Sequence, residues 1–179
     1  MWHAVTAEGR TLTRVPEHGA SRPWAAGPLL PTVGRSVWTV RVDSVSDHAV
    51  SDDIMLGVCD SETSLHAWGV SLRSGKLVRT TRTPTGQYSN DTSLPGWPDG
   101  PRGWQVMPRG LAPREMLGAR IDVLVDHEAG TLGFRVNGSQ LHPALGGFPE
   151  RGGAGLRPWA FLTRSGHRVS FEPGYLLQG

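Results

Sequence analysis

The stretch from Gly118 to Gly138, GARIDVLVDHEAGTLGFRVNG, decides the fold of this chain. It holds two apolar runs, Ile121–Val125 and Thr131–Val136, and in the second run every other residue is a large apolar one. This two-residue period is typical of a strand that buries one face. The polar segment that ends in Gly130 predicts a hairpin between the runs, and Asn137-Gly138 predicts a tight turn after them. The stretch therefore predicts antiparallel strands joined by short turns.

The same alternation extends outward along most of the chain. Many short strands with frequent turns predict an all-β sandwich of two antiparallel sheets. Only Pro113–Leu117 is expected to form a short helical turn. Further strands are expected at Leu12–Val15, Trp24–Ala26, Val37–Asp43, Ile54–Val58, Trp68–Leu72, Lys76–Thr80, Trp159–Thr163 and His167–Phe171. The core is expected to contain Trp38, Val40, Val123, Phe134, Trp159 and Phe171.

Length and composition indicate a single domain. The chain has 179 residues, of which 37% are hydrophobic, enough to build one core. Its 24 glycines and 14 prolines are spread without a repeat, as many turns between short strands require. We therefore expect one domain over residues 1–179.

The segment from Arg82 to Gly103 does not fit a strand. It is too rich in proline and glycine for regular structure and long for a passive connection. It also carries Tyr88 and Trp97, which a purely solvated loop does not need. Long loops with aromatic side chains either pack onto the body of a domain or bind a partner. The sequence leaves both possibilities open.

Composition argues against several classes of partner. The net charge is +2, Lys76 is the only lysine, and the arginines are scattered rather than gathered on one strand face, so we expect no nucleic-acid partner. No apolar run approaches the ~20 residues that span a bilayer, so we expect no membrane insertion. The N-terminus shows no signal peptide, and the sole cysteine, Cys59, can form no internal disulfide. We therefore expect a cytoplasmic protein in a reducing compartment.

No catalytic or metal-binding frame is present in the sequence. Serines and histidines occur, but no nucleophile elbow, zinc-binding helix motif or paired cysteines surround them. The carboxylates between Asp43 and Glu62 are irregularly spaced and lack the glycine of a calcium loop, so solvated loop carboxylates explain them better. We expect no enzyme activity, no catalytic residues, no cofactor and no metal.

Six segments, in their order along the chain, resemble the SPRY domain. The most specific runs from Asp126 through Gly130-Thr131-Leu132 to Asn137-Gly138. The others are Gly34–Val40, Ile54–Val58, Ala67–Val70 followed by Gly75–Leu77, Gly118–Asp126, and Leu156–Phe161 followed by Val169–Phe171. The resemblance covers roughly residues 10–172. It implies a sandwich of two antiparallel sheets whose loops at one edge form a pocket for a peptide or for the surface of a partner protein.

By spacing, the closest resemblance is to the SPRY domains that precede a SOCS box, which select substrates for a ubiquitin ligase. No SOCS box, F-box, RING or coiled coil accompanies the domain here, so a role in a ligase would have to be exercised in trans. This resemblance, with the aromatic residues of the long segment, implies one binding edge. Its expected contact residues are Pro16, Glu17, His18, Glu62, His66, Tyr88, Trp97, Thr163, Arg164 and Ser165.

Two departures from these relatives change the expected ligand. The segment Asp60–His66 is shorter than in the relatives and lacks their tyrosine, and Arg164 stands where they carry an aromatic residue. An arginine favours an acidic partner or one that offers a carboxylate for a bidentate contact. The leading hypothesis is a non-catalytic protein-recognition module. The alternatives are a constitutive structural subunit of a large assembly and, by fold analogy alone, a lectin-like carbohydrate-binding domain.

Overall fold

The computed structural model describes residues 11–13, 24–46, 53–60, 66–83, 88–91, 107, 109–139, 142–145, 155–164 and 166–172. These residues form strands and one short helix. The strands are β1 (Thr11–Thr13), β2 (Trp24–Ala26), β3 (Arg35–Ser44), β4 (Ile54–Asp60), β5 (His66–Ser71), β6 (Leu77–Arg82), β7 (Tyr88–Asp91), β8 (Arg120–Asp126), β9 (Thr131–Val136), β10 (His142–Leu145), β11 (Leu156–Leu162) and β12 (Arg168–Phe171). The helix is α1 (Pro113–Met116).

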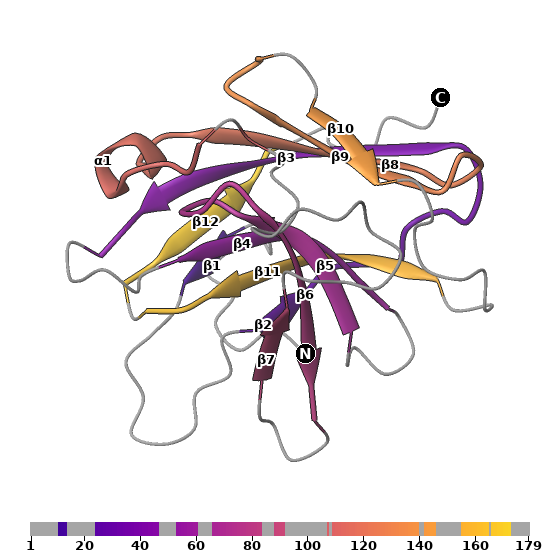
Figure 1. The fold of residues 1–179 in the computed structure, drawn as a ribbon, viewed down its shortest axis with the longest axis horizontal. Helices are drawn as coiled ribbons and strands as arrows, with labels where there is room; N and C mark the ends of the chain where they lie inside the picture. The colour runs from indigo at the N-terminus through magenta and orange to yellow at the C-terminus, as the bar shows by residue number, and fades with distance from the viewer. Residues whose placement is uncertain are drawn as a thin grey trace.

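The strands form two six-stranded sheets that pack as layers (Figure 1). Sheet A has the order β1-β12-β3-β8-β9-β10, and sheet B has the order β2-β11-β4-β5-β6-β7. Neighbouring strands are antiparallel throughout. The structure confirms the all-β sandwich of two antiparallel sheets, and α1 confirms the short helical turn expected at Pro113–Leu117.

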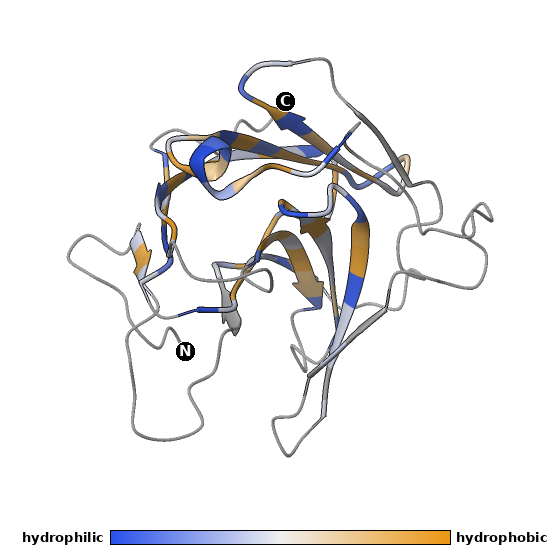
Figure 2. Ribbon diagram, turned by 60° about the vertical axis from the view of Figure 1, so that its left-hand side comes forward, coloured by the Kyte–Doolittle hydropathy of each residue, from blue (hydrophilic) through white to orange (hydrophobic). Residues whose placement is uncertain are grey.

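The inner face of sheet A is built by the three strands that the sequence marks most clearly. Trp38 on β3, Val123 on β8 and Phe134 on β9 lie in one cross-strand row, and each is at most 1% exposed. Apolar and polar residues alternate along these strands, as the hydropathy colours show (Figure 2). All six core residues expected from the sequence are buried. The two-residue period therefore predicted correctly which face of these strands is buried.

The centre of sheet B, around β4, is buried on both of its faces. Ile54, Leu56 and Val58 point into the core between the sheets, while Met55 and Cys59 belong to a second buried cluster on the outer face. This accounts for β4 being a nearly continuous apolar run, because a strand covered on both sides has no reason to alternate. Trp159 and Phe161 of β11 belong to the outer cluster as well.

A pair of glycines makes room for Trp159 on that outer face. Gly57 and Gly69 are directly opposite each other on β4 and β5, and Gly57 is also opposite Trp159 on β11. A Cβ atom on Gly69 would lie 2.9 Å from the Trp159 ring and 2.4 Å from the Leu56 carbonyl oxygen. The indole therefore lies across a strip of backbone that only glycine leaves free.

The turn signals are confirmed. The Asn137-Gly138 turn has positive φ at both residues, 49° and 72°, as a type I′ hairpin requires. The backbone N–H of Ser139 donates to the Val136 carbonyl at 2.9 Å and closes this turn between β9 and β10. Gly130 has a φ of 64° in the β8–β9 hairpin.

The sequence missed two strands, and both lie at the edges of their sheets. Tyr88–Asp91 falls in the segment that was expected to lack regular structure, yet it pairs with β6 as β7. β10 contains Pro143, which an edge strand tolerates because only one side of it donates to a neighbour. Neither stretch alternates in hydropathy, so the pairing depends on main-chain hydrogen bonds to an existing strand.

Candidate binding surface at the loop end

The sandwich has two ends, distinguished by the direction of β4. β4 begins at Ile54. At the same end of the sandwich, β5 and β11 end, and β12 begins. We call this end the loop end; its described residues are 44–46, 53, 71–76, 107, 109–119, 137–139, 162–164 and 166–168. At the opposite end lie Asp60, where β4 ends, and Tyr88, where β7 begins.

The expected binding residues do not share one edge. Thr163 and Arg164 follow β11 at the loop end, whereas His66 is opposite Thr81 and Tyr88 is opposite Arg82 at the other end. The length of β4, about 20 Å at ~3.3 Å per residue, separates the two groups. The structure therefore places these four residues at two ends of the sandwich rather than at a single edge, because antiparallel pairing puts loops that follow alternate strands at opposite ends. Their role in binding stays a prediction.

The remaining expected contact residues, Pro16, Glu17, His18, Glu62, Trp97 and Ser165, lie outside the described residues. The residues on either side of the segment that contains the first three are described. Thr13, which precedes it, is opposite Arg168, and Trp24, which follows it, is opposite Phe161. Both flanking residues therefore lie next to the loop end, on the same side as Thr163 and Arg164.

Thr163 is fixed to the start of β4. Its hydroxyl donates to the Asp53 carbonyl at 2.7 Å and accepts from the Asp53 N–H at 2.8 Å. Its own N–H donates to the same carbonyl at 3.2 Å. Three contacts to one residue hold the beginning of the β11–β12 connection, and this gives the chain around Arg164 a defined position.

The Asp53 side chain extends the same contact to the β5–β6 turn. Its carboxylate accepts from the Ser71 hydroxyl at 2.6 Å and from the Arg73 N–H at 3.2 Å. Burial raises the pKa of Asp53 above its ordinary value, and these two donors together with the Ile54 N–H and the Arg73 charge oppose that shift. Asp53 thus joins two connections of the loop end through one carboxylate.

The β5–β6 turn is held by hydrogen bonds within the turn and by others from residues outside it. Ser74 donates through its N–H and its hydroxyl to the Ser71 hydroxyl, at 3.0 Å and 2.7 Å. From outside, the N–H of Leu111 donates to the Leu72 carbonyl at 2.8 Å, and that of Met107 donates to the Gly75 carbonyl at 2.9 Å. Arg73 and Lys76 are therefore presented by a rigid turn.

A short helical turn forms the next part of the surface. Arg109 donates through both terminal nitrogens to the two Glu115 oxygens, at 2.8 Å and 2.6 Å. The N–H of Ala112 donates to the same carboxylate at 2.8 Å. The bidentate Arg109 contact and this N–H lower the pKa of Glu115 to about 2. Glu115 consequently stays charged, and it is already used by Arg109.

Positive charge predominates among the described residues of the loop end. Asp53 is largely withdrawn from water and Glu115 is paired, and these are the two carboxylates among them. The cationic side chains number six: Arg73, Lys76, Arg109, Arg114, Arg164 and Arg168. Five of these were not expected to bind a partner. Arg73 and Lys76 lie at the β5–β6 turn.

The described residues include no group of three or more histidine, cysteine, aspartate or glutamate side chains that could hold a metal ion. Within the same part of the chain, no helix has the length and apolar character to cross a membrane.

No protein-family model matches the sequence, and no curated protein matches it. Among solved structures, the chain is similar to the SPRY domain of human HERC1, with 19% identity and a TM-score of 0.57 over 94% of this chain and 90% of that one. It is also similar to the TRIM65 PSpry domain, with 14% identity and a TM-score of 0.56 over 94% of this chain and 84% of that one. The sheet order, the buried face and these likenesses agree, and the chain therefore has the fold of a SPRY domain.

Proposed function

We propose that this chain is a non-catalytic recognition module that binds an acidic segment of another protein at the loop end. The observation that carries the proposal is the excess of cations over carboxylates among the described residues of the loop end, whose connections are joined by Asp53 and Thr163. Arginine suits this task because its planar fork can engage a carboxylate through two hydrogen bonds. The SPRY fold supports a binding role, since the resemblance drawn from the sequence implies recognition through loops.

A finer proposal concerns the process that the module serves. The spacing of its motifs resembles SPRY domains that precede a SOCS box, so we propose that it selects substrates for a ubiquitin ligase in trans, inside the cell. If it does, a ligase should purify with it, and the amount of its bound partner should rise when the proteasome is inhibited. An unchanged amount would exclude the ligase role and leave the binding role intact.

The binding proposal is tested by affinity capture with matched variants. The full chain is used as bait in wild-type form, as the double variant Arg73→Ala/Arg164→Ala, and as the control Arg35→Ala. Arg35 is an exposed arginine at the opposite end of the sandwich, paired with Asp126 at 2.8 Å. Quantitative mass spectrometry should find proteins that the double variant loses and the control retains. Equal recovery with all three baits would contradict binding at the loop end.

A further inference from the structure

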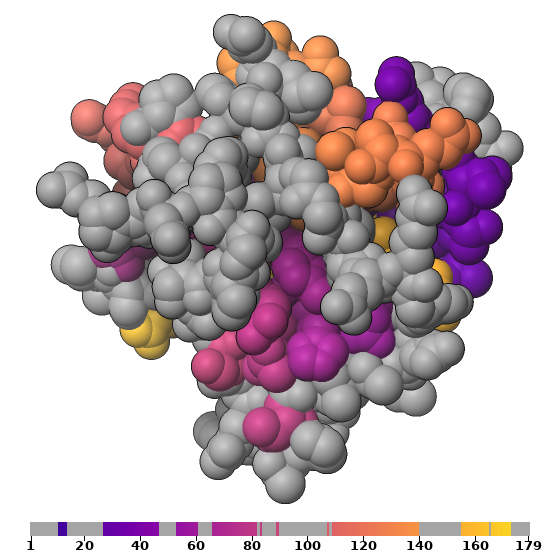
Figure 3. Space-filling view, turned by 45° about the vertical axis from the view of Figure 1, so that its right-hand side comes forward, coloured from indigo at the N-terminus to yellow at the C-terminus, as the bar shows by residue number. Residues whose placement is uncertain are grey.

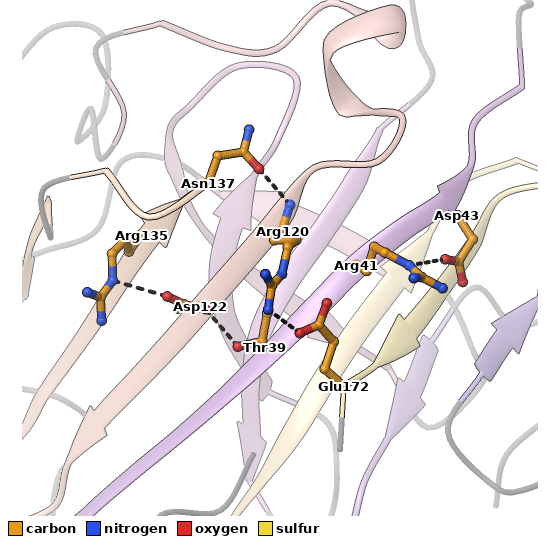
Figure 4. Close-up of polar contacts among 8 residues, drawn as sticks. All are labelled: Thr39, Arg41, Asp43, Arg120, Asp122, Arg135, Asn137 and Glu172. Carbon is orange, nitrogen blue, oxygen red and sulfur yellow. Dashed lines mark hydrogen bonds and ion pairs between the residues drawn. The ribbon is translucent and has the colours of Figure 1, made fainter. Parts of the chain in front are cut away.

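We propose that the outer face of sheet A carries a second protein-binding surface, centred on Arg41, Arg120 and Arg135, that fits an acidic extended segment of a partner. This surface goes beyond the function proposed above, because it uses the face of a sheet rather than the connections at its end. The three arginines come from neighbouring strands. Arg41 on β3 is directly opposite Arg120 on β8, and Arg135 on β9 is opposite Asp122, two residues further along β8 (Figure 4).

Each of these arginines is held by a carboxylate on the same face. Arg41 donates through Nε to Asp43 at 2.7 Å, and Arg120 pairs with Glu172 through one terminal nitrogen. Arg135 forms an ion pair in which its Nε lies 3.1 Å from an Asp122 oxygen (Figure 4). In the Arg41 and Arg135 pairs the contact uses Nε, and among the described residues the terminal nitrogens are left to a second acceptor.

The aspartate carboxylates, in contrast, can accept few further hydrogen bonds. The second oxygen of Asp43 accepts from the Ser170 hydroxyl, and the second oxygen of Asp122 accepts from the Thr39 hydroxyl at 2.7 Å. Both oxygens of each aspartate are therefore engaged within the sheet. The face offers donors to a partner and few acceptors, which selects for a partner that is rich in acceptors.

Exposure separates the two signs of charge in depth. The side chains of Arg41, Arg120 and Arg135 are 54%, 60% and 39% exposed, while those of their partners Asp43, Glu172 and Asp122 are 11%, 23% and 23% exposed. The guanidinium groups therefore form the outer layer and the carboxylates the inner one. An approaching molecule meets positive charge first, although the pairs are formally neutral.

The arrangement carries a cost and an advantage. Like charges directly opposite on neighbouring strands destabilise a sheet, and Arg41 faces Arg120 in this way. The nearby Glu172 carboxylate offsets part of the repulsion, since its charge also raises the pKa of Arg41. Because the carboxylates already fix the guanidinium groups, a ligand would lose less side-chain entropy in binding them than in ordering free arginines.

A neighbouring apolar row favours a protein over a nucleic acid. Val37 and Leu124 are opposite each other on β3 and β8, face outward and are half-buried, and Gly133 follows on β9. The segments drawn in violet and in orange adjoin at the surface (Figure 3). The two aliphatic side chains of this row lie beside arginines, a combination that is found in protein interfaces, in which arginine is enriched.

The test is a titration of the ¹⁵N-labelled full chain with decaglutamate at physiological salt, about 0.15 M, where weak surface attraction is screened. We expect the amide chemical shifts of Arg41, Arg120 and Arg135 to change. The shift changes of Arg73 and Arg164, at the loop end, serve as the comparison. The double variant Arg41→Lys/Arg120→Lys keeps both charges but removes the planar fork, so we expect affinity at this face to fall by roughly fivefold or more. Arg35→Lys is the matched control: Arg35 is also on β3 and makes the same kind of Nε contact, to the Asp126 carboxylate on β8, but it lies about 20 Å from Arg41 along the strand.

Three results would overturn the proposal. Shifts confined to the loop end would assign the decaglutamate to that surface alone. Equal affinity in the double-lysine variant would show that only net charge attracts the peptide. Tighter binding of decauridylate at the same three arginines would assign the face to nucleic acid. The proposal is supported if Arg35→Lys keeps its affinity for decaglutamate, the double variant loses affinity, and the melting temperature of both is unchanged.

Discussion

Single glycines decide how closely the strands of sheet B approach. A Cβ atom on Gly57 would lie 2.0 Å from the Trp68 carbonyl oxygen and 2.5 Å from the Gly69 Cα atom, both part of the backbone. Backbone atoms cannot move aside as the end of a flexible side chain can. The glycine-to-glycine contact is therefore a requirement for the Trp159 indole to lie flat across β4 and β5.

We expect Gly57→Ala to lower the free energy of unfolding by about 2–3 kcal/mol or more, because the added methyl group forces the strands apart. Urea denaturation measures this. Gly138→Ala is the comparison: it meets open space but requires a φ of 72°, and should cost about 1 kcal/mol. If the Gly57 variant cost no more than the Gly138 variant, steric contact at the glycine pair would not be the cause.

A histidine near the opposite end should give stability a pH dependence. His127 contacts the buried Ser36 hydroxyl through Nε2 at 3.1 Å, and burial lowers its pKa below 6.5, although the Asp126 charge opposes the shift. The unfolded chain then binds the proton more readily than the folded one does. Stability should therefore fall as pH decreases from about 7.5 through 6.5.

The measurement compares melting temperatures at pH 7.5 and 5.5 for the wild type and His127→Gln. Glutamine can still hydrogen-bond to Ser36 but does not titrate, so the decrease on acidification should be smaller in the variant. A decrease of the same size in both proteins would assign the pH dependence to other groups.

The sequence predicted elements well where hydropathy alternates and poorly where it does not. β3, β8 and β9 were predicted because one face of each is buried and the other meets water. β7 and β10 were missed because an edge strand can be held by main-chain hydrogen bonds to a neighbour, whatever its side chains.

The residues of the candidate site likewise include some that the sequence could indicate and some that it could not. Thr163 and Arg164 could be proposed from their place between two recognisable strands. The proposed contribution of Arg73 and Lys76 could not, since only the folded turn brings the Arg73 N–H to Asp53 and the Lys76 N–H to the Ser74 hydroxyl. The two ends of the sandwich were confused because sequence order does not reveal which loops share an end until the strand order is known.

At the scale of elements, Asp53 and Thr163 join β4 to the β11–β12 connection, and this contact can be tested directly. Thr163→Val keeps the shape of the side chain but loses the hydroxyl that bonds the Asp53 N–H and carbonyl. We expect a loss of about 1–2 kcal/mol in stability. Amide hydrogen exchange of residues 163–167 should accelerate, and Thr163→Ser should restore protection. Unchanged exchange in the valine variant would exclude this contact as the fixing element.

At the scale of the whole molecule, one row across β3, β8 and β9 ties the centre of sheet A to the core. Trp38 is 1% exposed and lies in that row with Val123 and Phe134. Trp38→Ala should cost about 3–5 kcal/mol as a large-to-small change in the core. Thermal unfolding with a far-UV spectrum of β type measures this, and a wild-type melting temperature in the variant would contradict the assigned core.

The two sheets together place cationic connections at one end and a guanidinium-covered face on one side. We propose that the cationic loop end recognises an acidic protein segment. The most direct measurement is calorimetric affinity for a captured partner with wild type, Arg164→Ala and Arg35→Ala. We expect Arg164→Ala to weaken binding by about 1–4 kcal/mol and Arg35→Ala to leave it unchanged. Equal affinity in all three proteins would contradict the claim and place the partner elsewhere on the sandwich.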